Sequence, residues 1–108
     1  DKYGFKISKI HNKPIKYLII TNGNQINKKE YYKFSRIKKA VLIIDTYFGK
    51  KRKILLKKTL LFNDNLETKK IFIKKYKYKV LGIQMKVKSI YPGTKYSNLS
   101  VSDFYVTF

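Results

Sequence analysis

The sequence has few of the residue types on which catalytic sites depend. It contains no cysteine, which excludes disulfide bonds and thiolate metal sites. It has one histidine and six acidic residues, too scattered for us to expect a calcium site or paired catalytic carboxylates. We find no nucleophile motif, and the Gly-Asn-Gln run at 23–25 lacks the further glycines of a dinucleotide loop. We therefore expect a protein that is not an enzyme and uses no cofactor, and the sequence leaves open whether it binds an ion.

Long hydrophobic runs are also lacking. Apolar stretches such as 41–44 are far shorter than the ~20 residues that a membrane-spanning helix needs, and we find no signal peptide. The 108 residues suffice for one domain with one core, so we expect a single domain over residues 1–108. Because the chain begins at Asp1 and not at a methionine, we expect it to be a fragment of a longer protein.

Positive charge is what the sequence has in excess. Its 26 basic and 6 acidic residues give a net charge of +20. Such a field favours anionic partners, namely nucleic acid, an anionic membrane or an acidic glycan. Only Arg36 and Arg52 are arginines, so we expect any nucleic-acid binding to be charge-driven and without sequence specificity. The lysines have a second interpretation, because they also solvate strand faces and prevent edge-to-edge pairing.

Apolar and β-branched segments recur at the spacing of an all-β domain. We expect strands at 5–10, 15–21, 40–46, 52–62, 70–74, 80–90 and 101–108, joined by turns at 12–14 and 47–49 and a loop at 63–65. The segment 40–46 is typical of a strand buried on both faces, and 80–90 alternates with Ile83, Met85 and Val87 on one face. About seven antiparallel strands predict a β-sandwich of jelly-roll type.

Two segments are ambiguous. In 28–39, Tyr31, Phe34 and Ile37 fall three apart, so this stretch is a long irregular loop that includes one or two helical turns or none. The segment 52–62 is either one long strand or two strands separated near Lys57-Lys58. Two adjacent lysines cannot both point outward from one regular strand, so we expect the lysine doublets at turns or sheet edges.

Histidine and tyrosine each have two interpretations. His11 is either the general base of a small basic ribonuclease or an exposed side chain without chemical role in the Asn-Lys-Pro turn. The ten tyrosines either stack on sugar rings or bases, or they close an end of the sandwich and hydrogen-bond a loop.

Two polar connections together resemble a known family. The first runs from Asn22-Gly23 through Tyr32 to the segment 35–38, Ser-Arg-Ile-Lys. The second is the segment 91–96, Tyr-Pro-Gly-Thr-Lys-Tyr, followed by Ser102-Asp103. With Gly4 in the first strand, this order resembles the NADase-type glycan-binding domain, which is similar to the translocation domain of streptococcal NAD glycohydrolase. The sequence departs from the family pattern at Asn24, Phe34, Asn98 and Asp103, where the family has Tyr, Asn, Asp and Glu.

The resemblance implies a galactose-binding, discoidin-like jelly roll that recognises cell-surface carbohydrate without catalysis. It also implies a secreted or surface-exposed bacterial parent protein, whose other domains are expected partners, and the charge favours an acidic glycan. The ligand-binding residues that it predicts are Asn22, Tyr32, Arg36, Lys38, Tyr91, Lys95 and Tyr96. The structural residues that it predicts are Gly23, Pro92, Gly93 and Asp103. We expect a type II turn with positive φ at Gly93, and we expect Arg36 either to join a buried network with Asp103 or to line a sugar groove.

Overall fold

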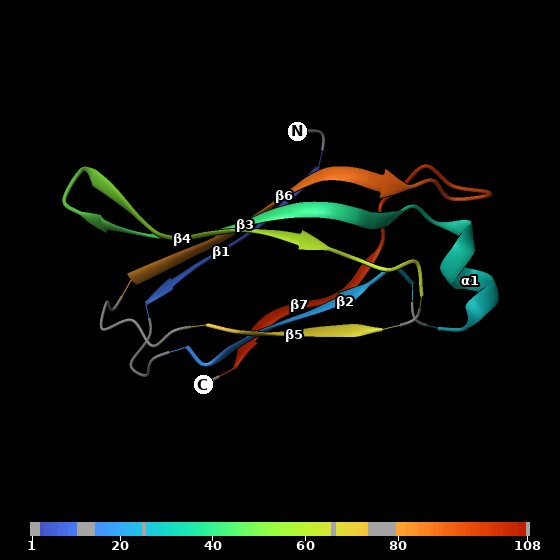
Figure 1. The fold of residues 1–108 in the computed structure, drawn as a ribbon, viewed down its shortest axis with the longest axis horizontal. Coiled ribbons are helices and arrows are strands. Elements are labelled where there is room, and N and C mark those ends of the chain that lie inside the picture. The colour runs from blue at the N-terminus through green and yellow to red at the C-terminus, as the bar shows by residue number, and fades with distance from the viewer. Residues whose placement is uncertain (1–2, 11–14, 25, 66, 74–79, 108) are drawn as a thin grey trace.

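The computed structural model describes residues 3–10, 15–24, 26–65, 67–73 and 80–107 (Figure 1). Strands make up most of this part of the chain, with one short helix between the second and third. The elements are β1 (Tyr3–Ile10), β2 (Tyr17–Asn22), α1 (Lys28–Lys33), β3 (Arg36–Phe48), β4 (Lys51–Leu61), β5 (Thr68–Phe72), β6 (Val80–Tyr91) and β7 (Val101–Thr107).

The strands form two antiparallel sheets that face each other. One sheet has the order β1-β6-β3-β4 and the other has the order β5-β2-β7. The chain is therefore an all-β antiparallel sandwich, as the sequence predicted. Helix α1 lies at one end of the sandwich and the β3–β4 hairpin lies at the opposite end (Figure 1).

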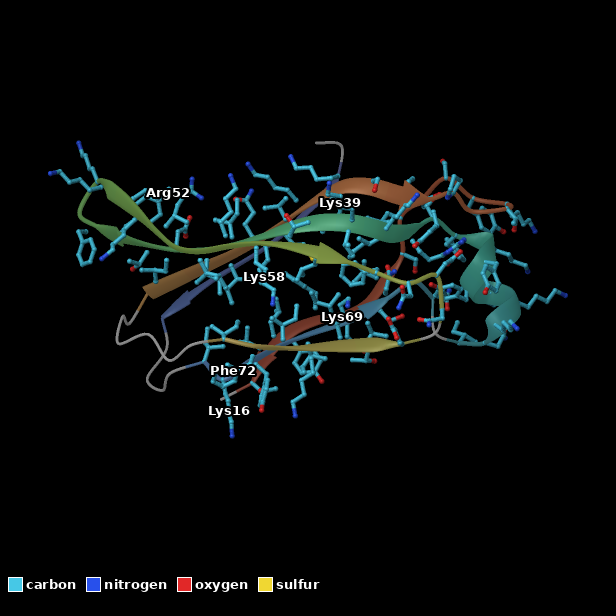
Figure 2. The ribbon with its side chains drawn as sticks, in the orientation of Figure 1. Lys16, Lys39, Arg52, Lys58, Lys69 and Phe72 are labelled. Atoms are coloured by element: carbon cyan, nitrogen blue, oxygen red, sulfur yellow. The ribbon has the colours of Figure 1, made fainter. Side chains whose placement is uncertain are left out.

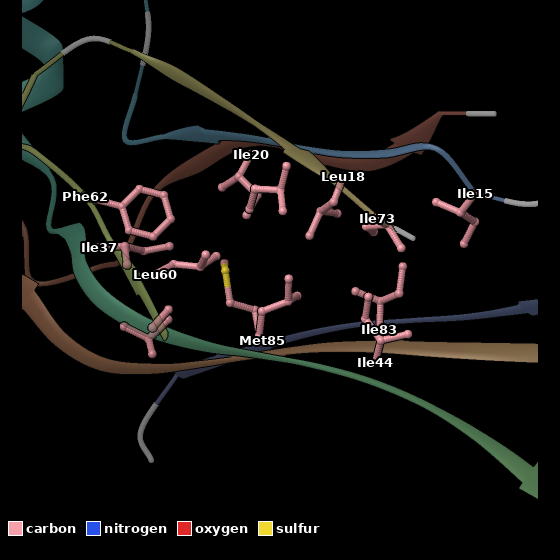
Figure 3. Close-up of a cluster of buried hydrophobic side chains, with 14 residues drawn as sticks. Ile15, Leu18, Ile20, Ile37, Ile44, Leu60, Phe62, Ile73, Ile83 and Met85 are labelled. Carbon is pink, nitrogen blue, oxygen red and sulfur yellow. The ribbon is translucent and has the colours of Figure 1, made fainter. Parts of the chain in front are cut away.

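The core forms where the alternating apolar residues of the two sheets meet. Ile83 and Met85 of β6 are fully buried, and Figure 3 shows them facing Leu18 and Ile20 of β2. Each such side chain contributes about 1.5–3 kcal/mol by leaving water. Strand β3 lies between β6 and β4 and is buried on both faces in its middle, where Ile43 is only 6% exposed. Both predictions, the buried stripe of β6 and the two-sided burial of β3, are confirmed.

The first ambiguous segment, 28–39, contains both a helix and the start of a strand. Helix α1 begins after Asn27, whose side chain accepts a hydrogen bond from Glu30 N at 2.9 Å and so satisfies one of the helix's free amides. The helical spacing that includes Ile37 was misleading, because β3 already begins at Arg36. Ile37 is buried in the core as a residue of β3, so the strand begins earlier than the predicted start at residue 40.

The hairpin between β3 and β4 also differs from the predicted turn at 47–49. Tyr47 and Phe48 still belong to β3, and the turn consists of Gly49 and Lys50 only. Gly49 has φ +63°, which suits the first position of a two-residue hairpin turn. Strand β4 is one long strand, with a register shift opposite Ile44 and Asp45 instead of a break near Lys57.

The described lysine clusters at 50–53, 57–58 and 69–70 lie at a turn or on edge strands, as expected. Lys57-Lys58 and Lys69-Lys70 belong to the edge strands β4 and β5. In the run 50–53, Lys50 belongs to the β3–β4 turn and the other three residues begin the edge strand β4, while Lys39 lies at a register shift between β3 and β6. The Lys74-Lys75 doublet, His11 and the predicted turn at 12–14 lie outside the described residues. In the part that the structure covers, no helix is long and apolar enough to cross a membrane.

Candidate ligand-binding end of the sandwich

The connection 92–100 between β6 and β7 is attached to the end of helix α1. Thr94 N donates to Tyr32 O at 3.0 Å, and Lys95 N and Tyr96 N donate to Lys33 O at 3.2 and 2.8 Å. The last carbonyls of a helix have no partner within the helix, and here this loop supplies the partners. The conformation of the predicted Tyr-Pro-Gly-Thr-Lys-Tyr segment is therefore set by backbone bonds to α1.

Ser35 holds the same loop from the other side. Its amide donates to Asn98 O and its carbonyl accepts from Ser100 N, both at 3.0 Å, and its hydroxyl accepts from Gly93 N at 3.1 Å. Ser35 is only 1% exposed, so these three bonds are shielded from water. Within α1, Lys33 Nζ donates to Glu30 Oε1 at 2.9 Å, and this bond lowers the pKa of Glu30 and raises the pKa of Lys33.

Arg36 is the centre of this end of the molecule. Its Nε and Nη2 donate to the two carboxylate oxygens of Asp64 at 3.0 and 2.8 Å, which makes a bidentate ion pair. Its Nη1 donates to the carbonyls of Phe34, Tyr32 and Pro92 at 3.0, 3.2 and 3.4 Å. Arg36 thus joins α1, the β4–β5 connection and the 92–100 loop.

Three tyrosine rings surround the guanidinium of Arg36. Its central carbon lies 5.2 Å from the ring centre of Tyr31, 5.1 Å from that of Tyr32 and 5.8 Å from that of Tyr91. Such rings stabilise a desolvated cation through their negative faces. Only 5% of the Arg36 side chain is exposed, so the structure places this residue in the framework of the site and leaves almost none of its surface for a ligand.

Asn22 connects the two sheets at this end. Its Nδ2 donates to Ile37 O and its Oδ1 accepts from Ile37 N, both at 2.8 Å. Asn22 ends β2 and Ile37 lies near the start of β3, so the side chain acts as a bridge between strands of different sheets. Asn22 is 1% exposed and therefore presents no surface to a ligand, although the sequence placed it among the ligand-binding residues.

Two glycines of the predicted motif are required here for different reasons. Gly23 has φ +75°, and a Cβ at this position would lie 2.6 Å from Tyr31 Cε1 and 2.9 Å from Arg36 Cγ. The predicted positive φ at Gly93 is wrong, since only Gly23 and Gly49 have one among the described residues. Gly93 is needed because a Cβ there would collide with the carbonyl oxygens of Lys33 and Tyr96. Close approach of α1 to the loop, and not a type II turn, explains the glycine after Pro92.

Tyr31 is enclosed behind Arg36. It is 0% exposed, and no described group lies in hydrogen-bonding geometry with its hydroxyl. Its ring packs edge-to-face on the ring of Tyr32 at 5.0 Å. Burial raises the pKa of Tyr31, the nearby carboxylate of Asp64 raises it further, and Arg36 acts in the opposite direction. Tyr31 thus fills the space under the framework as a neutral side chain.

The more exposed predicted residues form two pairs of a lysine and a tyrosine. Lys38 is exposed, and its Nζ lies 5.7 Å from the ring centre of Tyr91, whose hydroxyl donates to Phe62 O at 2.7 Å. Lys95 is also exposed, and its Nζ lies 5.3 Å from the ring centre of Tyr96. Each pair combines an aromatic face with an exposed positive charge, while Tyr32 contributes its carbonyl and ring to the group of residues around Arg36.

Tyr96 is the most open of the predicted tyrosines. It is 38% exposed, and its ring stacks on Phe34 with ring centres 4.7 Å apart and an angle of 30° between the planes. Phe34 follows α1 directly, so the stack fixes the plane of the Tyr96 ring relative to the helix. A ring held in this way loses little side-chain entropy when a ligand stacks on it.

The prediction that Arg36 pairs with Asp103 is wrong. Asp103 is exposed on β7, opposite Thr21 of β2, whereas the guanidinium of Arg36 reaches Asp64. The structural role of Tyr31 and the stacking role of Phe34 were not predicted from the sequence. Asp64, in the predicted loop 63–65, gave no signal of its own, because its partner is 28 residues away in sequence. Among the residues that the structure covers, no group of three or more metal-ligating side chains comes together.

The fold and this end of the molecule define a class, a β-sandwich whose loops at one end are tied to a buried arginine. Residues 3–107 match the family described as the NAD glycohydrolase translocation F5/8 type C domain, and the chain belongs to that family. The match confirms the resemblance seen in the sequence. The family is a translocation domain and not the catalytic part of a glycohydrolase. Comparison with the curated proteins gave no match, and comparison with the solved structures gave none either.

Proposed function

We propose that this domain is a non-catalytic module that binds acidic glycans on a cell surface on behalf of an exported bacterial protein. The family supports an exported parent protein, since a translocation domain serves transport of the chain that carries it. The net charge of +20 supports an acidic ligand over a neutral one. By binding glycans, the domain then delivers or anchors the further domains of the parent protein.

The observation that carries this proposal is the fixed, exposed ring of Tyr96 beside Lys95. Sugar rings present flat C–H faces that stack on an aromatic plane, and a few placed polar groups provide specificity. Lys95 Nζ lies 5.3 Å from the ring centre of Tyr96, which supports a role in pairing with a carboxylate or sulfate group of a sugar bound at that ring. Lys38 and Tyr91 offer the same combination where β3 pairs with β6.

A glycan array tests the proposal when it is read at about 0.15 M and about 0.5 M salt, because the higher ionic strength screens exposed charges much more strongly. We expect discrete sulfated or sialylated glycans to remain bound at the higher salt. Polyanion signal that disappears at the higher salt, without preference among sugars, would mean that charge alone drives binding, as in a nucleic-acid binder.

Substitutions then locate the site. Tyr96→Ala is expected to weaken binding of the retained glycans about ten-fold, and Lys95→Gln about five-fold. Tyr105→Ala and Lys57→Gln are matched controls, because both residues are exposed and lie on strands away from the 92–100 loop. Equal losses from the variants and their controls would contradict the assignment of the site to this loop.

A further inference from the structure

The β3–β4 hairpin has a surface unlike that of the rest of the molecule. It forms the end of the sandwich opposite α1 and extends past the ends of β2, β5 and β7 (Figure 1). Residues 47–54, which we term the hairpin tip, are all exposed. The extents of the described chain are 45 × 26 × 18 Å, so the tip lies at one end of an elongated body. A protruding segment of this kind is free to reach a surface before the rest of the protein does.

The hairpin tip exposes apolar side chains on both of its faces. Tyr47 is 55% exposed, Phe48 is 53% exposed and Ile54 is 49% exposed. Neighbouring residues of a strand point to opposite faces, so Tyr47 and Phe48 lie on opposite sides of the two-stranded ribbon. Exposed large apolar groups gathered in one place are unusual on a domain this basic and indicate an interaction site.

The hairpin tip is also strongly basic. Lys50, Lys51, Arg52 and Lys53 are consecutive and exposed (Figure 2 labels Arg52). Asp45 lies beside them and accepts a hydrogen bond from Arg52 Nε at 2.6 Å, which offsets a single charge. The register pairs Tyr47 with Arg52 and Phe48 with Lys51, so each face of the ribbon carries one aromatic residue next to one cation.

We propose that the hairpin tip docks into the interface of an anionic lipid bilayer. Aromatic rings favour the boundary between headgroups and acyl chains, and lysines beside them meet anionic headgroups. The two-sided arrangement favours this partner, because a bilayer interface surrounds an inserted ribbon, whereas a polysaccharide or nucleic acid contacts one face. The proposal concerns the end opposite the glycan site and does not depend on it.

Vesicle sedimentation of the full chain tests the proposal. The wild type is expected to bind vesicles with about 30 mol% phosphatidylserine and to bind phosphatidylcholine vesicles far more weakly. The double variant Tyr47→Ser, Phe48→Ser should lower partitioning about ten-fold, and Lys50→Gln with Lys51→Gln about thirty-fold. Phe72→Ser and the pair Lys28→Gln, Lys29→Gln are the matched controls, because these residues are exposed elsewhere, and they should change partitioning less than three-fold by roughly the same scale.

A fluorescence measurement separates insertion from adsorption. The sequence has no tryptophan, so Phe48→Trp places one tryptophan in the hairpin tip, and Phe72→Trp places one on β5 as the control. We expect a blue shift and quenching by brominated lipid at position 48 and neither at position 72. Unchanged emission at position 48, or wild-type partitioning of the Tyr47, Phe48 variant, would overturn the proposal. Loss of heparin binding in that variant, with no vesicle binding by the wild type, would overturn it in favour of a polysaccharide.

Discussion

The two ends of this sandwich use the same residue types in opposite ways. At the α1 end, Arg36 is buried among three tyrosine rings and holds Asp64 with two hydrogen bonds. At the hairpin end, Arg52 is 40% exposed in its side chain and makes one bond to Asp45, while Tyr47 projects into water. At the α1 end the polar groups bind one another inside the protein, whereas at the hairpin end they face solvent.

The difference shows why residue type alone does not identify a binding residue. An arginine beside tyrosines is a framework when its donors are used by backbone carbonyls and a carboxylate. The same pair is a recognition surface when both side chains face solvent. The place of the arginine in the fold decides whether it is a framework or a recognition residue. Three connections converge on Arg36, whereas Arg52 lies on the edge strand β4 at the hairpin tip.

The largest expected effect is that of removing the central arginine. Arg36→Ala should lower the free energy of unfolding by about 3 kcal/mol, because it leaves Asp64 and three carbonyls without their donor. Arg52→Ala, the same change at the open end, should cost less than about 1 kcal/mol. Urea denaturation of the two variants measures both values. Equal losses would show that the two ends do not differ as described.

The two glycines with positive φ give a second contrast. Gly23→Ala should lower the free energy of unfolding by about 2–3 kcal/mol, because backbone strain adds to collision with Tyr31 and Arg36. Gly49→Ala should cost only about 1 kcal/mol, because no atom of the described residues other than its chain neighbours lies within 4 Å of a Cβ in that turn. Thermal unfolding followed by circular dichroism ranks the two, and a larger loss at Gly49 would contradict the packing at the α1 end.

The smallest effect concerns Tyr31. Because its hydroxyl is buried without a described partner, Tyr31→Phe should leave the free energy of unfolding at pH 7 unchanged or raise it by up to about 1 kcal/mol. A loss of about 2 kcal/mol instead would show that the hydroxyl makes a stabilising bond.

Tyr31 also predicts a difference at alkaline pH. The folded state raises the pKa of Tyr31 above its ordinary value of 10.0, so the folded chain keeps a proton that the unfolded chain releases. This stabilisation is complete below about pH 10 and is lost as the pH rises further. The free energy of unfolding should therefore fall more steeply above about pH 10 in the wild type than in Tyr31→Phe. Parallel curves from urea denaturation would contradict the raised pKa.

The strands were predictable because a strand that is buried on one face alternates apolar and polar residues along its sequence. The β6 stripe of Ile83, Met85 and Val87 depends only on side chains of one strand, so sequence spacing is enough. The family pattern likewise located Asn22, Arg36 and the segment 91–96 at one end of the fold. These residues were found, but their division into framework and surface was not.

What could not be predicted depends on contacts between distant segments. The partner of Arg36 is Asp64, from a loop with no motif, and nothing in the local sequence distinguishes it from Asp103. The need for Gly93 arises from the close approach of α1, which follows from backbone packing and not from its own turn. The exposure of Tyr47 and Phe48 follows from a hairpin that outreaches the opposite sheet, which no single strand reveals.

The two ends of the sandwich are expected to have separate partners, and a crossed assay tests this division. Tyr96→Ala and the double variant Tyr47→Ser, Phe48→Ser would each be measured against the best array glycan and against anionic vesicles. We expect Tyr96→Ala to lose glycan binding and keep vesicle binding, and the double variant to do the reverse. Parallel losses of both partners in both variants would contradict this division and would show that one charged surface serves every anion.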